Sequence, residues 1–74
     1  MCFLDTNVLV YAFGKHDPRK RETARSLAES GDAFVSTQVL SELANVLTRR
    51  MGFSAAETRS RISGIAASCE VIVV

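Results

Sequence analysis

The sequence predicts an α/β fold built on a three-stranded parallel sheet with flanking helices. Short apolar segments alternate with longer segments that carry helix caps and helical periodicity. Strands separated by helical crossovers pair in parallel, because a tight turn joins only antiparallel neighbours. The expected order of elements is therefore β-α-α-β-α-α-β. No linker or repeat divides the chain.

The first strand is expected at Cys2–Leu4, a short apolar segment that ends at Asp5. Three polar residues, 5–7, separate it from a second apolar stretch, Val8–Phe13. The pattern of that stretch fits a strand or a short helix, and the polar break favours the helix.

A helix is expected from Pro18 to about Ser30. Asp17 is a good N-cap and Pro18 suits the first helical position, where its missing N–H costs nothing. Gly31 is a stop signal. The segment Asp32–Ser36 then contains the second short strand, Ala33–Val35.

The next helix is expected to begin at Ser36 or Thr37 and to end at Gly52. Its apolar residues recur at helical spacing: Val39, Leu40, Leu43, Val46 and Leu47. Ser54 and Glu57 form a capping-box pattern for a last helix that runs to about Ser68.

The third strand is expected at Glu70–Val74, and its aliphatic run lacks alternation, which is typical of a strand covered on both faces. The chain has 74 residues, about half a typical domain, although its 47% hydrophobic composition is that of a globular protein. We therefore expect residues 1–74 to be the N-terminal portion of a single larger domain, with further chain or a partner covering the run.

Composition excludes several classes of protein. A formal net charge of +1 gives no strong global field towards nucleic acid or membrane. The N-terminus has no basic, signal-like region, and the apolar runs are far shorter than the roughly 20 residues that span a bilayer. A cytoplasmic protein is expected, with Cys2 and Cys69 reduced and acting as packing residues.

Two acidic residues are candidates for chemistry. Asp5 follows a buried strand, and ligands of open α/β sheets bind beyond the carboxyl ends of strands. Glu42 lies on the helix after the second strand, where it can point over the same edge. Two converging carboxylates repel unless a proton or a cation lies between them, and such hard oxygen ligands suit Mg²⁺ or Mn²⁺.

Each of these residues also has a purely structural interpretation. Asp5 can be a turn cap, and Glu42 a partly exposed helix residue. Thr6 and Asn7 can be helix caps or can orient the acid, whereas Ser36 fits a cap. The basic residues around Lys15 form a solvated face or a patch that contacts phosphates. The sequence has no glycine-rich phosphate loop, nucleophile elbow or Cys/His cluster.

Two segments resemble PIN domains, the nuclease fold of VapC-type toxins in toxin–antitoxin systems. Residues 3–12, FLDTNVLVYA, resemble the opening of the family, and residues 35–43, VSTQVLSEL, are similar to the segment that carries its second acid. Both occur in order on a matching pattern of elements, and the resemblance covers all 74 residues but only the N-terminal part, about the first half to three-fifths, of a PIN domain.

The resemblance implies a Mg²⁺- or Mn²⁺-dependent ribonuclease in which Asp5 and Glu42 are catalytic and bind the metal. A metal-activated water would cleave RNA phosphodiesters. Residues beside the acids would orient them: Thr6, Asn7 and Ser36. Basic residues would hold the RNA backbone without reading its sequence: Lys15, Arg19, Arg49 and Arg50. A cognate antitoxin protein would be a partner.

The chain departs from the family pattern in one respect. PIN domains supply a third acid after the third strand, and no residue beyond Glu70 is acidic here. Two carboxylates would hold a metal weakly, so we expect weak or no activity from these 74 residues alone. The alternative is a non-catalytic remnant that binds an antitoxin or forms homodimers through exposed strand edges.

Overall fold

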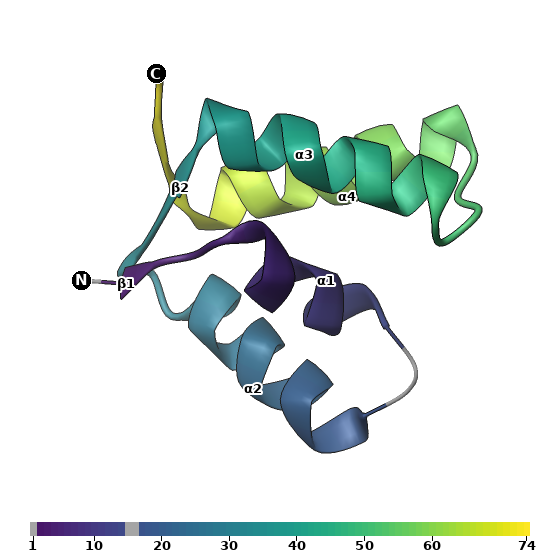
Figure 1. Cartoon of the computed structure of the whole chain (residues 1–74). Helices are drawn as coiled ribbons and strands as arrows, with labels where there is room; N and C mark the ends of the chain where they lie inside the picture. The colour runs from purple at the N-terminus through teal and green to yellow at the C-terminus, as the bar shows by residue number, and fades with distance from the viewer. Residues whose placement is uncertain (1, 15–16) are drawn as a thin grey trace.

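A computed structural model describes residues 2–14 and 17–74. The elements follow the expected order, β-α-α-β-α-α-β (Figure 1). Their bounds are β1 Cys2–Phe3, α1 Thr6–Phe13, α2 Pro18–Glu29, β2 Ala33–Ser36, α3 Thr37–Arg49, α4 Ala55–Ser68 and β3 Glu70–Ile72. The predicted α/β fold class is confirmed.

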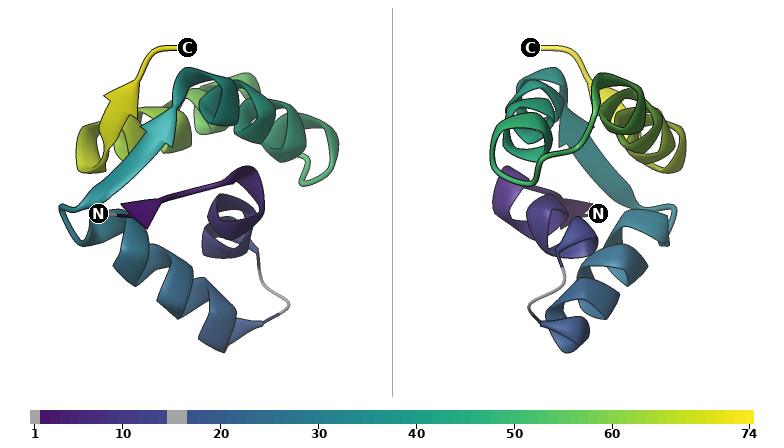
Figure 2. Two further views of the ribbon diagram at one scale, coloured as in Figure 1. Left: turned by 60° about the vertical axis from the view of Figure 1, so that its left-hand side comes forward. Right: turned by 90° about the vertical axis from the view of Figure 1, so that its right-hand side faces the viewer.

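The three strands form one parallel sheet in the order β1-β2-β3. Phe3 pairs with Phe34, and Val35 pairs with Val71. The central strand is therefore β2, and β1 and β3 form the two edges. Figure 2 shows α1 and α2 grouped on the β1 side of the molecule and α3 with α4 grouped on the β3 side. All three strands run in the same direction, so their carboxyl ends lie at the same end of the sheet.

Helix caps explain where the helices begin. The Asp17 side chain accepts a hydrogen bond from the Lys20 amide at 3.1 Å, and Ser36 accepts from Val39 at 3.1 Å. Ser54 and Glu57 form the predicted capping box at the start of α4. These caps satisfy backbone amides that the first helical turn leaves unpaired.

Two glycines allow the chain to turn after α2 and α3. Gly31 has φ 85° and Gly52 has φ 71°, in the left-handed region that glycine adopts without a steric penalty. Both were predicted as helix stops, and each lies within three residues of a helix end.

The stretch after Asp5 is a helix, which decides between the two structures its pattern allowed. Leu9 and Ala12, three residues apart, are buried on one face of α1. Among residues 2–14 and 17–74, the largest fully buried side chains are those of Leu4, Leu9, Val35, Leu43 and Leu47. This core fixes α1 and α3 against the sheet, and so fixes the residues at their N-terminal ends.

Both cysteines are free and half-buried, as expected for packing residues. The Cys69 thiol donates a hydrogen bond to the Ala28 carbonyl at 3.6 Å. Burial raises the pKa of the Cys69 thiol above its ordinary value.

The last aliphatic residues differ from the expectation. The strand β3 ends at Ile72, and Val73 and Val74 are 81% and 78% exposed. At the opposite edge, Phe3 is 63% exposed although it stacks on Phe34 with ring centroids 5.8 Å apart. A search of the described residues found no helix with the length and apolar character needed to cross a membrane.

Candidate functional site

Asp5 lies where β1 ends and α1 begins. Its Oδ1 accepts a hydrogen bond from the Val8 amide at 2.9 Å, which makes it the N-cap of α1. The side chain is exposed to solvent. The cap uses one carboxylate oxygen, so the capping role and a second role in binding a cation are compatible.

Glu42 lies on the second turn of α3. Its Oε2 accepts a hydrogen bond from the Thr6 hydroxyl at 2.9 Å, across 36 positions of sequence. Its Oε1 accepts from Gln38 Nε2 at 3.5 Å. Thr6 directly follows Asp5 in the sequence. Its hydrogen bond therefore holds the Glu42 carboxylate at the start of α1, next to the residue that caps this helix.

Hard cations fit this set of donors. Mg²⁺ commonly binds through one or two carboxylates and keeps several water ligands, so two exposed carboxylates with a free approach from solvent suit it. Among residues 2–14 and 17–74, however, no group of three or more His, Cys, Asp or Glu side chains could hold a metal. Any site here would therefore rest on two protein carboxylates.

The comparison with protein families gives a match that spans almost the whole chain. The family model described as the PIN domain matches residues 2–74. The chain belongs to the PIN-domain family. The PIN domain is a nuclease-type fold whose members are generally dependent on divalent metals and typically bind RNA. A search of curated proteins gave no match.

The residues predicted to orient the acids, Thr6, Asn7 and Ser36, differ from one another in what they contact in this PIN domain. Thr6 was expected to orient Asp5, but its hydroxyl donates to Glu42. The Ser36 hydroxyl accepts from Val39 as the cap of α3. Asn7 is exposed on the first turn of α1. Gln38 was not predicted to contact Glu42. Its position four residues earlier on the same helix would have predicted this contact, because residues at that spacing are neighbours on a helix surface.

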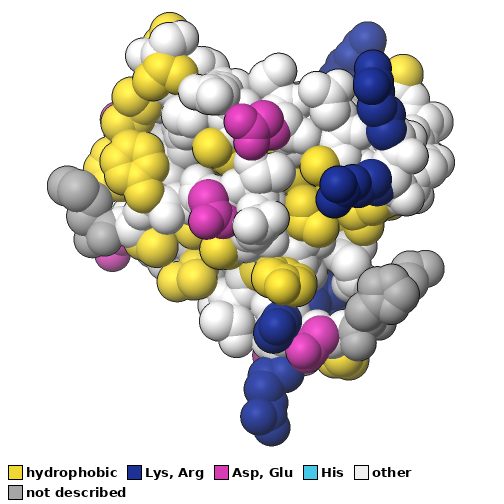
Figure 3. Space-filling view, in the orientation of Figure 1, with side chains coloured by type: hydrophobic (Ala, Val, Ile, Leu, Met, Phe, Trp, Pro, Cys, Tyr) yellow, Lys and Arg dark blue, Asp and Glu magenta, His cyan; other side chains and the backbone are white. Residues whose placement is uncertain are grey.

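The basic residues predicted to contact RNA do not form one patch. Arg19 is exposed near the start of α2, whereas Arg49 and Arg50 lie at the end of α3. Lys15 lies outside the described residues. Figure 3 shows acidic side chains near the middle of one face and Lys and Arg side chains towards its margins. Asp5 and Glu42, which we call the acidic pair, are both exposed to solvent.

Proposed function

We propose that this PIN domain belongs to a metal-dependent endoribonuclease of the VapC toxin type, which cleaves RNA phosphodiesters. The Thr6–Glu42 hydrogen bond is the single observation that carries the proposal. It joins the beginning of α1 to α3 where Asp5 and Glu42 lie. If Glu42 were only a surface residue of α3, its exposed carboxylate would not need a hydrogen bond from Thr6, the residue next to Asp5.

Each side chain has a defined role in the proposal. Asp5 and Glu42 would hold Mg²⁺ or Mn²⁺. Such a cation supplies an activated water and neutralises charge that develops on the phosphate. Thr6 and Gln38 each donate to one oxygen of Glu42, which restricts the rotation of that carboxylate. The cap at Val8 restricts Asp5 in the same way.

The activity of these 74 residues alone is expected to be weak. Two carboxylates leave most of the cation's ligands to water, and water ligands fix its position poorly. That residues 1–74 form the N-terminal portion of a larger PIN-like domain stays a prediction. A cytoplasmic location, an antitoxin partner and backbone contacts from Arg19, Arg49 and Arg50 also stay predictions.

Cleavage of a labelled single-stranded RNA in Mn²⁺ tests the proposal. We expect slow cleavage that EDTA abolishes and that Asp5→Asn and Glu42→Gln each reduce by at least about tenfold, because each removes a charged ligand. Asp17→Asn is a matched control, since Asp17 caps α2 as Asp5 caps α1. Cleavage that is independent of metal, or equal in Asp5→Asn and Asp17→Asn, would contradict the proposal.

The exposed strand edges favour a second candidate function, a module that associates without cleaving RNA. Phe3 on β1 and Val71 on β3 are exposed at opposite edges of the sheet. Unpaired edges with apolar side chains promote pairing between chains. Dimers in sedimentation velocity, with no Mn²⁺-dependent cleavage, would favour this candidate, and a monomer at high concentration would exclude it.

A further inference from the structure

A hollow lined by arginines lies away from the acidic pair. It has a volume of about 800 Å³ and lies where α1 and α3 end, against α2 and α4. Its lining includes four arginines and two phenylalanines: Arg21, Arg25, Arg50, Arg61, Phe13 and Phe53. We call this the arginine hollow. No motif in the sequence brings these six residues together.

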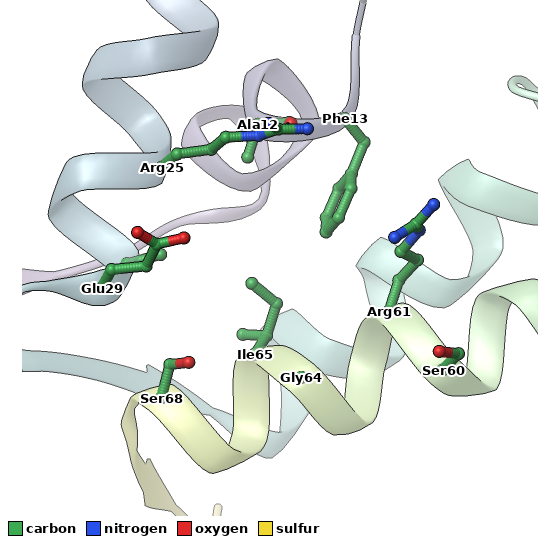
Figure 4. A pocket seen from close by; sticks show the side chains of 10 residues that line it. Ala12, Phe13, Arg25, Glu29, Ser60, Arg61, Gly64, Ile65 and Ser68 are labelled. Atoms are coloured by element: carbon green, nitrogen blue, oxygen red, sulfur yellow. The ribbon is translucent and has the colours of Figure 1, made fainter.

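The arginines reach the hollow from three parts of the fold. Arg21 and Arg25 lie on α2, Arg50 caps the end of α3, and Arg61 lies on α4. Arg25 is held in place because its Nε donates to the Ala12 carbonyl at 3.1 Å. Figure 4 shows a neighbouring pocket that shares residues with the arginine hollow, and there Arg25 and Arg61 extend from opposite sides towards the Phe13 side chain.

Positive charge exceeds negative charge in the arginine hollow. Glu57 is the acidic residue in its lining, and its carboxylate accepts a hydrogen bond from the Ser54 amide at 3.1 Å. Four guanidinium groups around one opening repel one another, and an anion placed between them removes that repulsion. Guanidinium groups bind phosphate oxygens through paired N–H donors.

Part of the lining of the hollow is apolar and aromatic. Phe13 and Phe53 are half-buried and pack against the core. Aromatic rings beside arginines are the combination with which proteins bind single-stranded nucleic acid, because bases stack on the rings while phosphates contact the cations. An acidic peptide would satisfy the arginines but has no general need for two aromatic rings.

The arginine hollow lies within reach of the acidic pair along both helices. Phe13 lies eight positions after Asp5 along the path of α1, and Arg50 lies eight positions after Glu42 along the path of α3. At 1.5 Å per helical residue, each path is about 12 Å. One extended RNA strand could therefore contact the acidic pair and the arginine hollow together.

We propose that the arginine hollow binds a nucleotide of single-stranded RNA that flanks the phosphate at the acidic pair. The arginines contact its phosphate, and Phe13 and Phe53 receive its base. This subsite rests on the proposed function, because it names where the same substrate is held. It assigns RNA contacts to Arg21, Arg25 and Arg61 in addition to Arg50.

Binding of a fluorescein-labelled 12-nucleotide RNA, followed by anisotropy in EDTA, tests the subsite without metal or cleavage. We expect Arg61→Gln and Arg50→Gln each to weaken binding about fivefold and to reduce the log–log salt slope by about 0.7, the value for one phosphate contact on a single strand. Arg59→Gln is the matched control, because Arg59 is exposed on the same helix as Arg61 but is not among the residues lining the hollow. Phe53→Leu should weaken binding with no change in slope.

The outcomes separate this proposal from the proposed function. Equal losses in Arg61→Gln and Arg59→Gln would overturn the subsite, since they would reflect overall charge alone. A hollow that binds a glutamate-rich peptide more tightly than the RNA would also overturn it. Either result leaves metal-dependent cleavage standing, whereas absent cleavage with selective loss in Arg61→Gln and Arg50→Gln would uphold the hollow as an RNA site. Melting temperatures of all variants show whether each remains folded.

Discussion

The sequence presents two roles for Asp5 as alternatives, a helix cap and a metal ligand, and the structure makes them compatible. The residue is the N-cap of α1 through Oδ1, and its carboxylate is exposed beside the residue that binds Glu42. Local pattern is sufficient to predict the cap, because a cap depends on residues three apart. A cap uses one oxygen, so the cap interpretation never excluded the metal interpretation.

Substitutions at Asp5 can separate stability from chemistry. Asn is about as good an N-cap as Asp, so Asp5→Asn should keep most of the stability, whereas Asp5→Ala should lose about 1 kcal/mol because the Val8 amide loses its partner. Urea denaturation measures both free energies of unfolding. Equal losses in the Asn and Ala variants would show that the charge, rather than the cap, stabilises α1.

Thr6 marks the limit of sequence reasoning at the scale of single residues. Its position beside Asp5 was predicted to matter, but its partner was not, since 36 positions separate it from Glu42. Which acid Thr6 contacts depends on how α1 and α3 pack. The Gln38 contact was missed, although it depends only on spacing within one helix.

At the scale of elements, helix starts were the most predictable features. Asp17, Ser36 and Ser54 each cap the helix expected of them, because capping depends on neighbouring residues. The strand β3 is shorter than its aliphatic run, since a strand extends only as far as a neighbour pairs with it. The arginine hollow was not predictable, because it depends on the packing of four helices.

The capping box of α4 should make stability depend on pH. The hydrogen bond from the Ser54 amide lowers the pKa of Glu57 below its ordinary value, and the Ser54 hydroxyl and Arg61 lower it further. A group with a depressed folded-state pKa stabilises the fold above its unfolded pKa, and this contribution is lost as the pH falls through the folded pKa. The wild type should therefore lose a stabilising contribution as the pH falls, whereas the Glu57→Gln variant lacks this contribution at every pH.

Denaturation curves from pH 7 down to about pH 3 measure this difference, the range in which an exposed carboxylate titrates. We expect the advantage of wild type over Glu57→Gln to shrink as the pH falls. Glu70→Gln is the control, because it removes an exposed carboxylate of β3 that belongs to no capping box, and an equal trend in that variant would contradict the role of the capping box. An advantage that stays constant with pH would contradict the role of the charge.

At the scale of the whole molecule, parallel topology explains why the candidate site exists. The parallel strands β1 and β2 are neighbours, so the segments that follow them leave the sheet at the same end. The start of α1 therefore lies close to α3. The order of the elements was predictable from alternating patterns, and it implies this convergence. The exact contact depends on the buried core between the helices and the sheet, which includes Leu9 and Leu43.

The central claim is that Asp5 and Glu42 form one cation site. Titration of the chain with Mn²⁺, with free Mn²⁺ followed by electron paramagnetic resonance, tests it most directly. The account predicts one saturable site per chain that Asp5→Asn or Glu42→Gln weakens by at least about tenfold and that Asp17→Asn leaves unchanged. No saturable binding, or the same affinity in the wild type and both variants, would contradict the claim.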